Sequence, residues 1–103
     1  TYIIDWNILW KLKNLLILDL RYNQIKIIEN NTFDHLVKLQ TLFLGPNPIK
    51  IIESNVFQSL FNLNNLILSE NSLQLISNYL FKDSKKLNEI IINNNKITNI
   101  EKD

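Results

Sequence analysis

Residues 39–62 read LQTLFLGPNPIKIIESNVFQSLFN, and the same apolar pattern returns on either side of them. Asparagine marks the period of this pattern, because it recurs every 24 residues at Asn23, Asn47, Asn71 and Asn95. Each of these asparagines has the same apolar neighbours. The positions eight, five and three residues before it, and two and five residues after it, hold leucine or isoleucine. Self-similarity at a fixed period of roughly 20 to 29 residues is typical of a solenoid, in which stacked repeats bury a continuous core.

The period divides the 103-residue chain into one array of repeats. Residues 15–38, 39–62 and 63–86 are full repeats, residues 1–14 read as the end of a preceding repeat, and residues 87–103 form a partial one. We therefore expect a single segment of a longer array. Its uncapped ends are expected to expose apolar surface and to promote self-association.

The Leu-x-Leu centre of each repeat has a period of two, so its leucines face one way and the residues between them face the other. Short strands are predicted near residues 16–20, 40–44, 64–68 and 88–92. Successive turns of a coil make such strands parallel, with right-handed crossovers between them. The predicted fold is an α/β right-handed solenoid with a parallel sheet on one side and short helical turns or irregular loops on the other. Candidate N-caps for these turns are Asn31 or Thr32 and Ser54 or Asn55.

Two repeating columns are predicted to be structural. An asparagine amide both donates and accepts hydrogen bonds, so stacked copies can form a ladder that satisfies backbone groups where the chain leaves each strand. The ladder residues are Asn23, Asn47, Asn71 and Asn95. An aromatic spine should fill the back of the coil, built from Phe33, Phe57 and Phe81, with Leu9 in the first slot.

One position departs from the pattern. Ser84 takes the slot that Leu12, Leu36 and Leu60 hold in the other repeats, so we expect the last full repeat to pack less well.

This pattern closely resembles the leucine-rich repeat family. The 24-residue period, with phenylalanine five residues after the second isoleucine, is similar to the family's typical subtype. The resemblance implies an arc with the parallel sheet on its concave side. It also implies an extracellular or cell-surface protein, membrane-anchored or secreted, because this subtype is found mostly in Toll-like receptors, adhesion receptors, and secreted binding and matrix proteins. The family's extracellular arrays normally end in cysteine-bearing caps, and this chain has no cysteine.

The residues between the inward leucines are the candidate ligand-binding residues, since they would face outward from the concave sheet. The central column would present an apolar stripe of Phe43, Ile67 and Ile91, continued by Asp19. An apolar centre with a polar rim is typical of protein interfaces, although single exposed apolar residues are also common on surfaces without a function. The predicted rim consists of Asp19, Arg21, Tyr22 and Glu70, and the other candidate residues beside the stripe are Thr41, Asn65, Ser69, Glu89 and Asn93.

A few other residues lie outside the predicted concave face. Asn30 begins the sequon Asn30-Asn31-Thr32 and is a candidate N-glycosylation site, although an asparagine-rich chain contains such sequons by chance. His35 is expected on the solvated back surface. Trp6 and Trp10 are expected to cover an edge of the array.

Charge and motif content exclude several classes of function. The net charge is +1, with acidic and basic residues interspersed, so neither nucleic acid nor membrane is expected as a partner of this segment. No apolar run approaches the roughly 20 residues that span a bilayer. No catalytic constellation, phosphate-binding glycine loop or metal-ligand cluster is present, so we predict a non-enzyme without cofactor or metal.

The sequence therefore predicts a non-catalytic module that binds a protein ligand or homotypic partner through its concave face, within an extracellular receptor, adhesion protein or secreted protein. Two alternatives stay open. The segment could belong to an intracellular scaffold or substrate-recognition arm, or it could be a structural stretch of a longer array without contacts of its own.

Overall fold

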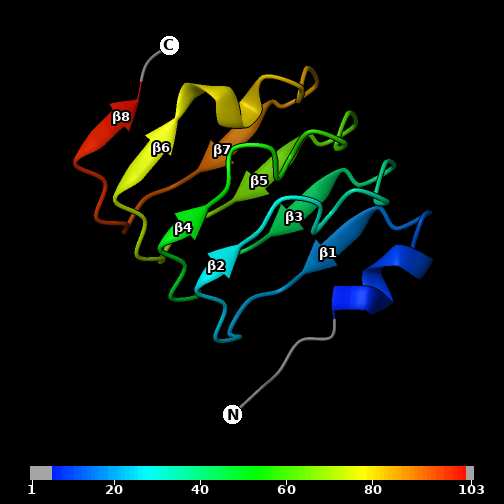
Figure 1. Ribbon diagram of the computed structural model, residues 1–103, viewed down its shortest axis with the longest axis horizontal. Coiled ribbons are helices and arrows are strands. Elements are labelled where there is room, and N and C mark those ends of the chain that lie inside the picture. Colours follow the sequence, from blue (N-terminus) through cyan, green and yellow to red (C-terminus); the bar gives the residue numbers. More distant parts are fainter. Residues whose placement is uncertain (1–5, 102–103) are drawn as a thin grey trace.

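Four short parallel strands form the main sheet of the molecule (Figure 1). In the computed structural model, which describes residues 6–101, these strands are β1 (Ile17–Asp19), β3 (Thr41–Phe43), β5 (Asn65–Ile67) and β7 (Glu89–Ile91), in that order across the sheet. Each residue pairs with the residue 24 positions later, as Leu18 does with Leu42. The predicted parallel solenoid of the leucine-rich repeat type is confirmed. The outer ends of its first and last segments, residues 1–5 and 102–103, lie outside the described residues.

The strands of the main sheet are three residues long, shorter than predicted. Their hydrogen bonding nevertheless continues one residue further, because the Leu20 amide donates to the Phe43 carbonyl at 2.9 Å and the Leu44 amide to the Ile67 carbonyl at 2.8 Å. Beyond that point each chain turns away from the sheet.

A second row of strands lies beside the main sheet (Figure 1). It consists of two separate parallel pairs, β2 (Ile27–Ile28) with β4 (Ile51–Ile52) and β6 (Leu75–Ser77) with β8 (Asn99–Glu101). The sequence pattern assigned one residue of each strand, Ile28, Ile52, Ile76 or Ile100, to an apolar slot and did not predict the strands. They form because the stacked repeats also hold this part of each turn in register, with Ile27 beside Ile51.

The back of the coil is built from turns and two short 3-10 helices, η1 (Trp6–Lys11) and η2 (Asn78–Phe81). The predicted N-caps are wrong, because no helix begins near Asn31 or Ser54. Thr32 instead donates from its hydroxyl to the Glu29 carbonyl at 2.6 Å. The residue that caps η2 is Ser77, whose Oγ accepts from the Tyr79 amide at 3.2 Å.

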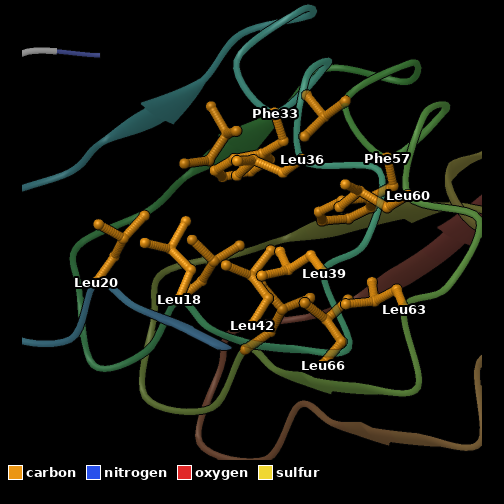
Figure 2. Packing of buried hydrophobic residues seen from close by; sticks show 14 of the residues in the cluster. Leu18, Leu20, Phe33, Leu36, Leu39, Leu42, Phe57, Leu60, Leu63 and Leu66 are labelled. Atoms are coloured by element: carbon orange, nitrogen blue, oxygen red, sulfur yellow. The ribbon is translucent and has the colours of Figure 1, made fainter. Parts of the chain in front are cut away.

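The core lies between the main sheet and the back turns (Figure 2). Leu42 and Leu66 point inward from the sheet and are fully buried, and Figure 2 shows Phe33 and Phe57 on the opposite side of the core. Burying large aliphatic and aromatic side chains contributes about 1.5–3 kcal/mol each, so the stacked repeats stabilise one another.

Apolar side chains become exposed toward both ends of this core. Ile90 is 39% exposed, whereas Leu42 and Leu66 in the same slot are fully buried. At the other end, Ile8 is 56% exposed, whereas Val56 in the equivalent slot is fully buried. The end repeats therefore bury less apolar surface than the central ones.

Candidate ligand-binding face

The register of the main sheet brings the predicted central column together on one face. Asp19 pairs with Phe43, Phe43 with Ile67, and Ile67 with Ile91, on strands that lie about 4.8 Å apart in such sheets. Phe43 and Ile67 are half-buried, and Ile91 at the edge of the sheet is 37% exposed. The column is thus a continuous apolar line whose central members have part of their surface covered.

Arg21 covers one end of this line. Its guanidinium carbon lies 4.8 Å from the centroid of the Phe43 ring, in a cation–π arrangement. The same guanidinium donates from Nε to Asp19 Oδ1 at 2.9 Å and from Nη2 to Asp19 Oδ2 at 2.7 Å. A ligand that approaches Phe43 therefore meets an ion pair beside the ring.

The ion pair shifts the pKa of both partners. The side-chain hydrogen bonds from Arg21, assisted by its backbone N–H at 3.0 Å from Oδ1, hold the pKa of Asp19 below its ordinary value. The hydrogen bond to Asp19 in turn raises the pKa of Arg21. Both side chains are 45% exposed, so the pair lies in contact with solvent.

A polar column runs along the start of the strands. Thr41 pairs with Asn65 and Asn65 with Glu89; Thr41 and Asn65 are half-buried, and Glu89 at the sheet edge is exposed. On the other side of the apolar line lie Ser69, which is half-buried, and Asn93, which is exposed.

The residue before three of the four ladder asparagines turns the chain out of the sheet with a left-handed backbone. Tyr22 has φ of 60°, Glu70 of 56° and Asn94 of 59°. Tyr22 is 80% exposed in this turn and Glu70 is also exposed, so both rim residues face solvent. Proline cannot adopt a positive φ, and at Pro46 the turn contains a cis peptide bond after Gly45 instead.

Gly45 leaves a gap in the rim because there is no room for a side chain. A Cβ at this position would lie 1.8 Å from the Ser69 carbonyl oxygen and 2.6 Å from Asn71 Nδ2. The polar border of the apolar line is therefore discontinuous between Arg21 and Ser69.

The ladder asparagines lie directly beneath the rim and join adjacent repeats. The amide oxygens of Asn47, Asn71 and Asn95 each accept a hydrogen bond from a backbone N–H of the preceding repeat. The donors are, in the same order, Ile25 at 3.4 Å, Ile49 at 3.2 Å and Leu73 at 3.1 Å. The amide nitrogens of these asparagines donate to strand-end carbonyls, as Asn47 does to Leu20 at 2.9 Å. Asn23, in the first repeat, donates to the Leu20 and Arg21 carbonyls. The contacts run from side chain to backbone, and they hold each turn against the next.

The phenylalanines stack behind the core. The ring centroids of Phe33 and Phe57 are 6.4 Å apart with an interplanar angle of 3°, and those of Phe57 and Phe81 are 6.0 Å apart at 8°. Leu9 takes the first place in this column and is buried.

The other candidates lie away from this face. Asn30 is half-buried, its Oδ1 accepts from the Asn55 amide at 2.9 Å, and its backbone N–H donates to Glu53 Oε1 at 2.7 Å. His35 lies against Trp10, with ring centroids 4.2 Å apart, so it is less solvated than predicted. The Trp6 side chain is outside the described residues. Within residues 6–101, no three histidine, cysteine or acidic side chains come together to hold a metal ion, and no helix is long and apolar enough to cross a membrane.

A family model described as "BspA type Leucine rich repeat region (6 copies)" matches residues 7–103. The chain belongs to the leucine-rich repeat family. No curated protein matches this leucine-rich repeat chain. Among solved structures it is similar to a chain of the TLR13–ssRNA13 complex, with 40% sequence identity and a TM-score of 0.87. The match covers 94% of this chain and 14% of the TLR13-complex chain, so the segment corresponds to a small part of that protein's length.

Proposed function

We propose that this leucine-rich repeat segment binds a protein ligand or homotypic partner without catalysis, through the outer face of its main sheet. The observation that carries the proposal is the line formed by Phe43, Ile67 and Ile91, which the strand register holds on a preformed surface. Polar residues border it on both sides. A rigid apolar centre with a polar rim is the usual composition of a protein-binding surface, and membership of the family supports a protein-interaction role.

We further propose an extracellular or cell-surface context, in a receptor, adhesion protein or secreted protein. The likeness to TLR13 at 40% identity supports this placement. The intracellular scaffold and the purely structural stretch remain the alternatives against which the proposal is tested.

The binding face can be tested by placing a photo-crosslinking amino acid at position 67, with the exposed position 38 on the turn before β3 as the matched control. Both versions are exposed to secreted and cell-surface proteins of the source organism. We expect position 67, and not position 38, to capture a protein. Equal capture at both positions, or capture only of cytosolic proteins from a whole-cell extract, would contradict the proposal.

The captured protein then serves as a defined probe. The double variant Phe43→Glu and Ile67→Glu should abolish its binding while circular dichroism stays unchanged, because both substitutions put charge onto the apolar line. Unaltered binding by this folded variant would show that the contacts are made elsewhere.

A further inference from the structure

A second apolar column lies on the row of strands beside the main sheet. Ile27 is 51% exposed, Ile51 54% and Leu75 51%, which is more than any member of the Phe43 line. Ile27 and Ile51 are register partners on β2 and β4. The residues that follow them, Ile28 and Ile52, face the core. We call Ile27, Ile51 and Leu75 the lateral stripe.

Opposite charges border the lateral stripe. Lys26 and Lys50 precede its isoleucines in the chain, and Glu29 and Glu53 follow them on the other side; all four side chains are exposed. Glu53 accepts a hydrogen bond from the Asn30 amide. The side chains of Lys26, Lys50 and Glu29 have no hydrogen-bond or ion-pair partner in the part of the chain that the structure describes. The stripe thus lies between a column of two unpaired cations and a column of two carboxylates.

We propose that a second copy of this chain packs on the lateral stripe as a symmetric dimer. A two-fold axis parallel to the stripe exchanges its two borders, so Lys26 of one copy faces Glu29 of the other and Lys50 faces Glu53. A two-fold axis across the stripe would instead place lysine opposite lysine, and like charges facing each other across an interface are strongly unfavourable. The border charges therefore make the surface complementary to itself in a single orientation, as a two-fold symmetric interface requires.

A shallow hollow on the acidic side fits this arrangement. It has a volume of about 300 Å³ and is lined by Asn30, Ile52, Glu53, Ser54, Leu75 and Ser77. Lys50 of the second copy lies opposite Glu53 in the dimer. Its aliphatic stem packs along Leu75 and Ile52 while its ammonium group reaches the carboxylate, as long basic side chains do at apolar surfaces.

The dimer is expected to be weak and reversible. A stable interface buries about 800 Å² on each partner, and the whole chain exposes 6511 Å². Three half-exposed aliphatic side chains and four charged ones supply only part of such an interface. This surface is separate from the face proposed to bind ligand, so either proposal can fail without the other.

Sedimentation velocity of the whole chain over a wide concentration range tests the dimer. We expect reversible dimerisation that Ile51→Asp abolishes and that Lys26→Glu weakens by about tenfold or more, because like charges then meet twice across the two-fold axis. The double variant Lys26→Glu with Glu29→Lys restores the opposite pairing and should recover dimerisation. Neither of these two side chains has a hydrogen-bond or ion-pair partner within residues 6–101, so the reversals should leave folding intact.

Phe61→Asp, at an exposed apolar position on the turn before β5, is the matched control and should dimerise like the original chain. A chain that stays monomeric at every concentration overturns the proposal. So does association that Ile51→Asp and Lys26→Glu leave unchanged, which would place the contact at the apolar ends of the array.

Discussion

Arg21 reaches from the first full repeat to the next and places its guanidinium carbon 4.8 Å from the ring centroid of Phe43. Asp19 fixes this position, because it lies beside Phe43 in the sheet and receives both guanidinium hydrogen bonds. Register alone therefore does not decide what a ligand meets at Phe43. It meets a ring whose face is covered in part by the guanidinium of an ion pair.

The Asp19 carboxyl should titrate at a lower pH than an isolated aspartate. The pKa of Asp19 is lower in the folded chain than in the unfolded chain. The ion pair therefore contributes its full stability at pH values above the pKa of the unfolded chain. This contribution is lost as the pH falls through the pKa of the folded chain. Carbon-13 NMR of the carboxyl measures this directly. Arg21→Ala should return the Asp19 pKa toward its ordinary value, with little change in Tm because the pair is exposed. A titration that does not differ between the two proteins would show that the pair does not form in solution.

Asn47→Ala should destabilise the fold substantially. The substitution leaves the buried Ile25 N–H and the Leu44 carbonyl without the partner that Asn47 supplies, whereas the Leu20 carbonyl keeps its hydrogen bond from Asn23. Each unsatisfied buried group costs about 1–3 kcal/mol, so we expect a total loss of about 2–4 kcal/mol in urea denaturation.

Asn23→Ala is the matched control for this ladder position. Asn23 donates to Leu20, whose carbonyl also accepts from Asn47, and it accepts from no preceding repeat within the described chain. We expect a loss of less than about 1 kcal/mol. Equal losses in the two variants would mean that the inter-repeat bonds do not stabilise the array.

Gly45→Ala should lower the free energy of unfolding by about 1–3 kcal/mol, the usual cost of overpacking. Its Cβ would overlap the Ser69 carbonyl oxygen, and backbone cannot move aside as a flexible side chain can. Thermal unfolding followed by circular dichroism gives the change. Asn93→Ala, at an exposed position in the same column, is the control and should leave the free energy of unfolding unchanged. If Gly45→Ala also leaves it unchanged, adjacent repeats are further apart than the structure shows.

The period of 24 residues was sufficient to predict the main sheet, because in a stacked coil residues one period apart become register partners. It also predicted that Phe43, Ile67 and Ile91 share a column. The lateral strands could not be predicted in the same way. Lys26 and Ile27 both face outward, which breaks the alternation that marks a strand. The chain is extended there because hydrogen bonds from the adjacent repeat keep it so. Pairing between repeats of this kind leaves no signal in the local sequence.

Side-chain partners at the candidate site were also beyond the sequence pattern. Asp19 and Arg21 are two residues apart and were expected simply as rim residues; their contact with Phe43 depends on rotamers. Gly45 offered a usable signal. It is the only glycine in the chain and lies in a column that otherwise carries side chains, which is consistent with a close backbone approach.

Ser84→Leu should stabilise the last full repeat. Ser84 is buried, and within residues 6–101 its Oγ has no hydrogen-bond partner. Its amide donates to the Phe81 carbonyl at 3.1 Å, just as Leu60 donates to Phe57 at 3.1 Å, so the backbone already has the geometry that holds leucine elsewhere. Filling the slot and removing an unpaired hydroxyl should add about 0.5–2 kcal/mol in urea denaturation.

Ser84→Ala separates the two contributions to that gain. It removes the hydroxyl without filling the space, so it should give a smaller increase than Ser84→Leu. If leucine destabilises the repeat while alanine stabilises it, the slot around Ser84 has closed and the lower packing predicted there does not exist.

Single-stranded RNA should not bind to the main-sheet face, even though the TLR13 structure is of a complex with ssRNA13. Among the twelve candidate ligand-binding residues, Arg21 is the one cation, whereas Asp19, Glu70 and Glu89 are carboxylates, which gives a formal charge of 1 − 3 = −2. Arg21 is already paired with Asp19. Phosphate backbones are bound mainly by unpaired lysine and arginine, so this face repels them. The fluorescence anisotropy of a labelled RNA oligonucleotide at physiological salt should not change as the protein is added. The prediction is wrong if the RNA binds saturably, if this binding weakens as the salt concentration is raised, and if Ile67→Glu abolishes it.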